Sequence, residues 1–149
     1  MTVSSRQYRQ AHLDKRNCLP KKEQDMHLIE ATAAPVFELP GIAFTAMASP
    51  SRGSSELCTW KLTVAAGLPA TQPHSLDHDE ILMVTAGAVL IGVDGPLVRA
   101  GDALVVPAGT SIQLANPGSV DAEIYVAICA GFTATDADGT VIGTPPWAT

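Results

Sequence analysis

The chain has 149 residues, of which 46% are hydrophobic and 16% are charged, and its formal net charge at pH 7 is −6. This composition is typical of one globular domain with a sizeable core, not of a disordered chain. The negative charge argues against nucleic acid as a partner, and no apolar run approaches the roughly 18–20 residues of a membrane span. We therefore expect neither nucleic acid nor a membrane as a partner.

The three cysteines, Cys18, Cys58 and Cys129, are an odd number and have no CxxC spacing. This favours free thiols in a reducing compartment over a disulfide framework. The first residues are polar and lack the apolar segment of a secretory signal. Together these features predict a cytoplasmic protein.

Residues 1–27 differ in charge from the rest of the chain. They hold six Lys or Arg residues against three Asp or Glu residues, a balance of +3, whereas the remainder carries −9. We expect an N-terminal arm over 1–27 and a single domain over 28–149. Two interpretations of the arm remain open: a mobile or loosely docked segment, or a segment that wraps a partner subunit.

From residue 28 the sequence is typical of short strands. Strands are expected at 37–39 and 42–47, on either side of a Pro-Gly turn, and the composition of 49–55 predicts a loop. Residues 57–64 alternate strictly, so Trp60 shares one face with Cys58, Leu62 and Val64.

The second half continues the same pattern. Strands are expected over 80–92 with a break at Gly87, and over 97–99, 103–106, 110–115 and 122–129. Turn signals recur every 8–12 residues, which favours a β-sandwich or barrel. A turn is expected at 136–139, and Trp147, after two prolines, is expected to pin the tail to the barrel or to a partner subunit.

Two stretches then carry a recognisable motif. The first has Gly67, His74, Glu80 and Gly87, and the second has Gly101, Pro107, Gly109 and Asn116. Their spacing resembles the paired motifs of the cupin superfamily, at 67–87 and 101–116. The resemblance implies an all-β fold, the double-stranded β-helix or RmlC-like jelly-roll barrel, with a polar N-terminal arm added here.

Leu76 and Ile112 stand where the cupin pattern has its second and third histidines. The chain is thus similar to small single-domain bacterial cupins with degenerate metal-binding motifs. This resemblance implies a site inside the barrel, and a homodimer.

A metal site is one hypothesis for the remaining polar residues. Positions 74, 76, 78 and 80 have the same parity, so His74, His78 and Glu80 point the same way if the stretch is extended. Two imidazoles and one carboxylate could hold a divalent transition metal such as Fe, Mn, Ni, Cu or Zn. A bend before the strand would spoil the parity for His74 or for His78.

Two alternatives need no metal. In the first, desolvation raises the pKa of Glu80, and Glu80 and His74 serve as acid and base for a bound molecule. In the second, His74 is a satisfied residue at the barrel mouth, and His78 and Glu80 join Asp77 and Asp79 in a solvated cluster.

Further pocket candidates are Trp60, Leu76, Ile112 and Tyr125. Parity alone does not say which face of each strand looks inward. Tyr125 could orient a ligand through its hydroxyl group or cap the rim of the core.

These features predict an enzyme of the cupin type, an isomerase, cyclase or oxygenase of an organic metabolite with His74, His78 and Glu80 as catalytic residues. The alternative is a metal-free cupin binding module for a small apolar ligand. A third possibility, a dimeric scaffold, predicts a filled barrel.

Overall fold

The structure, a computed structural model, describes residues 25–149, so the predicted N-terminal arm falls almost entirely outside the described residues. The strands are β1 (Val36–Leu39), β2 (Ile42–Ala46), β3 (Leu57–Val64), β4 (His74–Leu76), β5 (Glu80–Ala86), β6 (Ala88–Ile91), β7 (Leu97–Arg99), β8 (Ala103–Val106), β9 (Leu114–Ala115), β10 (Ala122–Cys129), β11 (Ala134–Asp136) and β12 (Val141–Gly143). Two short 3₁₀ helices, η1 (Pro50–Arg52) and η2 (Pro146–Ala148), complete this part of the chain, which contains no α-helix. The predicted all-β class is confirmed.

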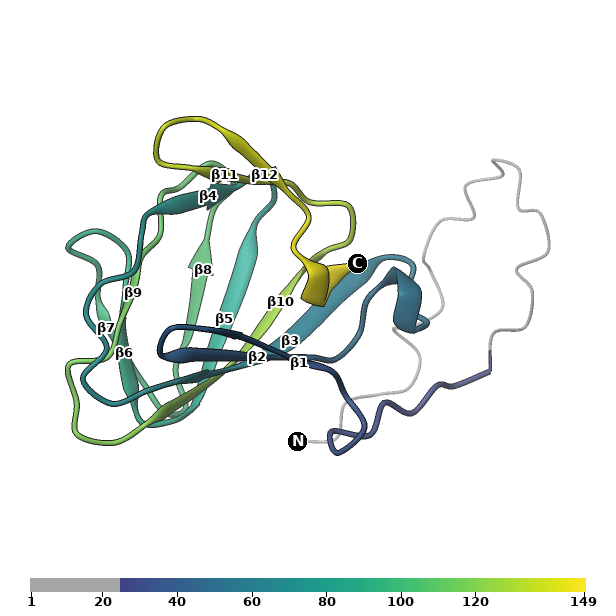
Figure 1. Cartoon of the computed structure of the whole chain (residues 1–149), viewed down its shortest axis with the longest axis horizontal. Coiled ribbons are helices and arrows are strands. Elements are labelled where there is room, and N and C mark those ends of the chain that lie inside the picture. The colour runs from purple at the N-terminus through teal and green to yellow at the C-terminus, as the bar shows by residue number, and fades with distance from the viewer. Residues whose placement is uncertain (1–24) are drawn as a thin grey trace, which may run out of the picture.

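One face of the molecule is a six-stranded antiparallel sheet with the order β1-β2-β3-β10-β5-β8. The long strands β3, β10 and β5 lie side by side in its middle (Figure 1). These strands are rich in β-branched and apolar residues, which suit a half-buried sheet.

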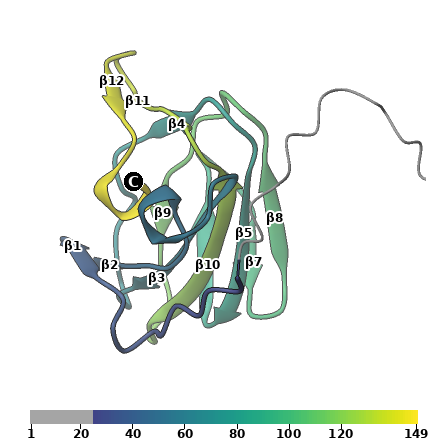
Figure 2. The same ribbon diagram turned by 90° about the vertical axis from the view of Figure 1, so that its right-hand side faces the viewer.

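The other face consists of two three-stranded sheets, with the orders β12-β11-β4 and β7-β6-β9. They are joined where His74 pairs with Ile112: the His74 amide donates to the Ile112 carbonyl at 3.1 Å, and the Ile112 amide donates to the His74 carbonyl at 2.8 Å. The strands of both faces form a ring in Figures 1 and 2. This is the jelly roll that the sequence motifs imply.

The core lies between the two faces. The four residues that alternation places on one face of β3, Cys58, Trp60, Leu62 and Val64, are all buried. Their cross-strand partners on β10 are buried too, so each pair extends the core by one row, as Trp60 and Val126 do. Strand alternation thus decides which side chains face the barrel interior.

Gly87 separates β5 from β6, as its place in the sequence predicts. It has a φ of +68°, and a Cβ atom there would lie 2.7 Å from the carbonyl oxygen of Asp121. Gly101 and Gly109 also have positive φ, as expected for tight turns. The motif glycines therefore serve the fold.

Some predictions were incomplete. The strand expected over 110–115 is reduced to β9 and the paired Ile112, and the 49–55 loop contains η1. The predicted turn at 136–139 exists, but it joins β11 and β12, two strands that the sequence analysis did not predict. In residues 25–149, no helix has the length and apolarity needed to cross a membrane.

Candidate functional site

Glu80, the first residue of β5, points into the barrel. Its cross-strand partners are Val106 on β8 and Ile128 on β10, both buried, and only 4% of Glu80 is exposed. One carboxyl oxygen, Oε2, is fully buried and has no hydrogen-bond partner. Because burial penalises the charged form, the pKa of Glu80 is raised to about 7.

Glu80 differs from the other buried polar side chains. Among residues 25–149 these are Ser49, Glu80 and Asn116. The Asn116 amide donates to the carbonyls of Val64 and Val120, and the Ser49 hydroxyl donates to the carbonyl of Thr149 at 2.8 Å. Asn116 and Ser49 connect separate segments of the chain, whereas one oxygen of the Glu80 carboxyl has no hydrogen-bond partner.

His74 lies in β4, on the same side of the strand as the buried Leu76. The residue is partly buried, and its pKa is lowered by desolvation, with a hydrogen bond to the backbone of Gln72 opposing the shift. A lowered pKa keeps the imidazole neutral at pH 7, when one ring nitrogen donates and the other accepts.

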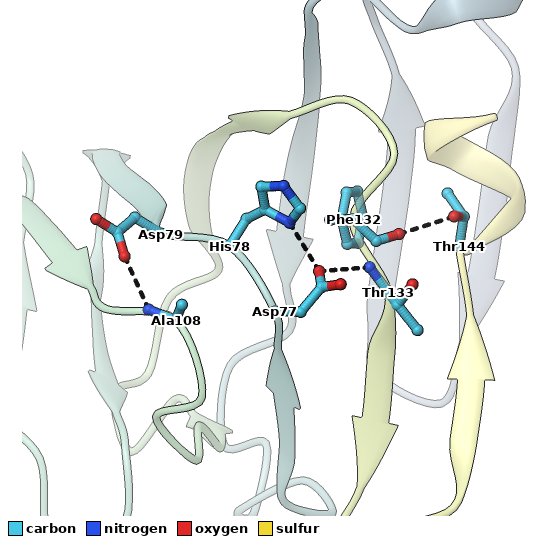
Figure 3. Close-up of polar contacts among 7 residues, drawn as sticks. All are labelled: Asp77, His78, Asp79, Ala108, Phe132, Thr133 and Thr144. Atoms are coloured by element: carbon cyan, nitrogen blue, oxygen red, sulfur yellow. Dashed lines mark hydrogen bonds and ion pairs between the residues drawn. The ribbon is translucent and has the colours of Figure 1, made fainter.

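His78 takes no part in this arrangement, because the chain bends between β4 and β5. Its Nδ1 lies 2.8 Å from Oδ1 of Asp77, and its side chain is 40% exposed. The same Asp77 oxygen accepts from the amide of Thr133 at 2.7 Å (Figure 3). These two contacts lower the pKa of Asp77, the Thr133 amide most.

On the other side of the bend, Oδ1 of Asp79 accepts from the amide of Ala108 at 2.8 Å (Figure 3). Asp77 and Asp79 thus tie the bend to two neighbouring segments. The bend interrupts the extended parity, and His78 is held at the surface. The solvated cluster considered above exists for Asp77, His78 and Asp79, but Glu80 is not part of it.

The residues present do not fit a metal centre. Within the described range, no three His, Cys, Asp or Glu side chains gather in a group that could hold a metal ion. The expected set of His74, His78 and Glu80 is not brought together, since His78 faces Asp77. Leu76 and Ile112, at the positions of the two missing histidines, have no donor atoms and are buried.

Three of the four pocket candidates face inward. Trp60, Leu76 and Ile112 are buried in the core, and Trp60 stacks on Phe132 with ring centroids 5.9 Å apart. Tyr125 does not face the barrel: it lies on the outer face of β10 and is 36% exposed. Phe132 was missed, because it lies in the loop after β10 and shows no periodicity.

The C-terminal residues also contact this interior. The indole of Trp147 stacks on Phe44 at a centroid distance of 3.9 Å and an interplanar angle of 20°. Its Nε1 is buried and has no hydrogen-bond partner. The expected pinning of the tail by Trp147 is therefore to the barrel of its own chain.

Two surface hollows, of about 230 and 330 Å³, lie away from these residues. One is next to β6 and β9 and includes Leu90 and Gln113, and the other is next to β2 and β3 and includes Ile42 and Thr63. Neither includes Glu80, His74 or Trp147.

No protein-family model and no curated protein matches the sequence. Solved structures do match the fold. An RmlC-like cupin protein from Ralstonia eutropha JMP134 has a TM-score of 0.65 at 12% identity, covering 83% of this chain and 80% of that one. The polyketide cyclase RemF from Streptomyces resistomycificus has a TM-score of 0.63 at 13% identity, covering 70% and 80%.

A third similar structure is a sugar phosphate isomerase of the cupin superfamily from Silicibacter pomeroyi, with a TM-score of 0.57 at 23% identity, covering 66% of this chain and 67% of that one. Proteins that share this architecture thus include a cyclase and an isomerase. At these identities the likeness concerns the fold, and the chain has the RmlC-like cupin fold that its sequence motifs predict.

Proposed function

We propose that this protein is a small-molecule enzyme of the cupin type in which Glu80 transfers protons to and from a bound organic molecule. The observation that carries the proposal is the buried carboxyl of Glu80, with an unpartnered oxygen and a pKa of about 7. A strongly shifted group inside a barrel is a functional candidate, because a structural carboxyl of this kind destabilises the fold.

The chemistry follows from that pKa. Near neutral pH, Glu80 is present both as a carboxylate, which can remove a proton, and as an acid, which can return it at another atom. Isomerisation and cyclisation of an organic metabolite are reactions that such transfers accomplish. His74, neutral at pH 7, is a second titratable group near this interior, and it can both donate and accept a hydrogen bond.

The same interior favours an uncharged, largely apolar substrate. No Lys or Arg is among the buried residues of 25–149, so a buried phosphate or carboxylate would meet no cation there. Trp60, Leu76 and Ile112 offer apolar surface instead. An anionic substrate would also repel the ionised form of Glu80.

A divalent metal on His74, His78 and Glu80 was the other form of this hypothesis. It requires His78 to leave Asp77 and turn inward, which the contacts of the 77–79 bend oppose. Oxygenation through such a metal has no support from these donors, and we derive no step through one.

The test uses a neutral, planar reporter, 5-nitrobenzisoxazole. A base removes its ring C–H proton, the electron pair forms the nitrile, and the N–O bond breaks to release a coloured phenolate. We expect turnover above buffer that rises with pH through a midpoint near 7 and is lost in Glu80→Gln. Asp79→Asn, at the adjacent exposed carboxyl, is the control and should retain the activity. Equal rates in wild type and Glu80→Gln would contradict the proposal.

The alternative is a metal-free module that only binds a small apolar ligand. The apolar residues Leu76 and Ile112 in the histidine positions favour it. The double variant His74→Ala, Glu80→Ala separates the two hypotheses: an enzyme loses turnover with its fold intact, whereas a binder keeps most of its affinity.

We also propose a homodimer formed through the outer face of the six-stranded sheet. Four large apolar side chains are exposed on three adjacent strands of this face: Ile81, Met83, Val105 and Tyr125. Cross-strand pairing places Ile81 beside Val105 and Met83 beside Tyr125, so the patch is continuous. A contiguous exposed apolar patch marks an interaction surface, and β8, an edge strand with one unpaired side, borders this one. A second copy would cover both.

A reducing, cytoplasmic location completes the proposal. It is supported by the thiols of Cys58, which is buried, and Cys129, which is exposed, both unpaired.

A further inference from the structure

Residues 77–79 form the crossover between the two faces of the jelly roll. β4, before them, belongs to the three-stranded sheet with β11 and β12, and β5, after them, belongs to the six-stranded sheet. Each face holds one end of the crossover through an aspartate. The carboxylate of Asp77 accepts from the amide of Thr133, and that of Asp79 accepts from the amide of Ala108 (Figure 3). The crossover is thus fixed at both ends, and β5 begins directly after the second of these bonds.

The bond to Asp79 lies where the ladder between β5 and β8 cannot continue. The last pair of this ladder is Glu80 with Val106, and the next residue after Val106 is Pro107, which has no N–H group to donate. The following amide, that of Ala108, donates to the Asp79 side chain at 2.8 Å instead of to a strand carbonyl. A hydrogen bond to an ionised acceptor is roughly twice as strong as a neutral one. The Asp79–Ala108 bond therefore closes the open end of the ladder.

Glu80 is buried only one residue away from the surface. It is 4% exposed, whereas Asp79 lies on the outside of the bend and is exposed. The neighbouring strands β8 and β10 face Glu80 with Val106 and Ile128, which carry no charge and cannot titrate, and burial raises the pKa of Glu80. Water would stabilise the ionised carboxyl, and the end of a strand ladder opens more easily than its middle. Some contact must therefore hold this end closed.

We propose that Asp79 is a positioning residue for Glu80: its bond to the Ala108 amide closes the end of the β5–β8 ladder and so keeps the Glu80 carboxyl inside the barrel. Asp79 is exposed, takes no proton itself and acts through its neighbour in the chain. The inference rests on the proposed function only for the use made of Glu80 in proton transfer. The position of Glu80 is measured without any substrate.

Loss of the Asp79–Ala108 bond should lower the pKa of Glu80. An open ladder end lets water reach the carboxyl, and its pKa then falls from about 7 toward the ordinary 4.5. Asp79→Ala removes both the hydrogen bond and a negative charge. Asp79→Asn removes only the charge, since the amide oxygen of asparagine still accepts from Ala108. The difference between these two variants therefore isolates the hydrogen bond.

The same bond can be broken at its donor. The Thr110 amide donates to the Pro107 carbonyl at 3.1 Å and Gly109 has a φ of +77°, so this turn is of type II with Ala108 at its second position. That position favours proline, which has no N–H group. Ala108→Pro therefore suits the turn, keeps the charge of Asp79 and removes only the donor.

The test is a pH titration of the full chain, labelled with ¹³C at the glutamate side-chain carboxyls and followed by NMR. Glu80→Gln assigns the Glu80 resonance by its loss. We expect a midpoint near 7 for Glu80 in wild type and in Asp79→Asn. In Asp79→Ala and in Ala108→Pro we expect a midpoint lower by about one unit or more.

Asp121→Ala is the matched control. The Asp121 carboxylate also accepts from an amide, that of Ala66 at 2.9 Å, and the residue is exposed. It precedes the first residue of β10, whereas Glu80 pairs with Ile128 near the end of that strand, about 20 Å away. Asp121→Ala should therefore lower the stability of the fold without moving the Glu80 midpoint.

Equal Glu80 midpoints in Asp79→Ala and Asp79→Asn, or a midpoint that Asp121→Ala lowers as far as Asp79→Ala does, overturn the proposal. If Asp79→Ala does not fold, Ala108→Pro decides, and a midpoint near 7 in that variant overturns the proposal as well. Catalysis is read separately, as the pH midpoint of 5-nitrobenzisoxazole turnover, which should follow the NMR midpoint in each variant. If the NMR midpoint moves and turnover does not follow it, the positioning role is supported and the catalytic role of Glu80 is contradicted.

Discussion

Glu80 and Ile128 are cross-strand partners on the inner face of the six-stranded sheet, a carboxyl directly beside a branched aliphatic side chain. Most buried carboxyls are paired with a cation or accept several hydrogen bonds. Here the cross-strand neighbour on the other side, Val106, is aliphatic as well. Glu80 therefore destabilises the folded state whenever it is ionised, so its contribution to stability must change with pH.

The first prediction is that Glu80→Gln stabilises the protein at pH 8 and has little effect at pH 4.5. The pKa of Glu80 is about 7 in the folded state against an ordinary 4.5. The folded state thus binds the proton more tightly, and stability falls as pH rises from 4.5 through 7. A shift of this size corresponds to on the order of 3 kcal/mol, which the uncharged glutamine avoids.

Urea unfolding of both proteins at several pH values measures this difference. Asp79→Asn, which removes one charge from the exposed residue next to Glu80 in the sequence, serves as the control for a change of net charge. A constant difference between Glu80→Gln and wild type from pH 4.5 to pH 8 would show that Glu80 is ordinary in the folded state.

The second prediction concerns His74 and has the opposite sign. Its pKa lies below the ordinary value of 6.5 because burial disfavours the imidazolium ion. Stability from this group is complete above pH 6.5 and is lost as pH falls through the folded pKa. In a Glu80→Gln background, which removes the competing titration, His74→Gln should flatten the loss of stability between pH 6.5 and pH 5. If the slope of unfolding free energy against pH were the same with and without His74→Gln, His74 would be solvated in the folded state.

Which side chains of β3 share a face was predictable from sequence, because side chains alternate strictly between the two faces of a strand, although alternation does not say which face is buried. Trp60 and its neighbours on β3 were assigned to one face, and that face is the core. The motif spacing also placed Glu80 inside the barrel and Gly87 at a break in a strand, and the structure has both residues there. Which face of β10 is inward could not be read from parity, and Tyr125 lies outside.

The position of His78 depended on information that parity does not contain. Three residues, 77–79, leave the extended conformation because Asp77 and Asp79 bind amides from segments distant in sequence, at Thr133 and Ala108. Such long-range contacts have no local signal. The docking of the C-terminal tail likewise depends on Phe44, about a hundred residues before Trp147, and the only local signal for it was the Pro-Pro-Trp sequence.

The third prediction follows from the bend. Added Zn²⁺ or Fe²⁺ should leave the melting temperature of the protein unchanged, and chelators should not lower it, since the described side chains offer no group of three ligands. A ligand that binds only the folded state raises the melting temperature, so the measurement is sensitive to weak sites. His78→Ala is the matched variant. If a metal raised the melting temperature of wild type but not of His78→Ala, the hypothesis of a metal site formed by His74, His78 and Glu80 would be supported after all.

The fourth prediction separates two reasons why a position requires glycine, namely a positive φ and a lack of space for a Cβ atom. Gly87→Ala should destabilise the fold by about 3 kcal/mol, because the residue has positive φ and its new Cβ would lie 2.7 Å from the Asp121 carbonyl oxygen. Gly101→Ala has the same backbone strain but open space around the Cβ, and should cost about 1 kcal/mol. Denaturant unfolding compares the two. Equal losses would mean that strain alone, without the close approach to β10, explains the break between β5 and β6.

The fifth prediction tests the assembly. Met83→Asp places a charge in the middle of the apolar patch on the outer sheet face, beside Tyr125. Met83 is 39% exposed within one chain, so a lone protomer should tolerate the aspartate, whereas two facing copies would bury two carboxylates. We expect wild type to be a dimer and Met83→Asp a folded monomer in light scattering after size-exclusion chromatography.

The control for this last variant is Val141→Asp, which adds the same charge to an exposed residue of β12, outside the six-stranded sheet. It should remain dimeric. A stable dimer buries about 1,200–2,000 Å² in total, so the patch around Met83 must form the centre of a larger contact, and one charge at the centre is more disruptive than one at the rim. A monomeric wild type, or a dimer that both variants preserve, would move the interface away from this face. Because Glu80 faces the opposite side of β5, loss of the dimer in Met83→Asp should leave proton transfer in the barrel intact.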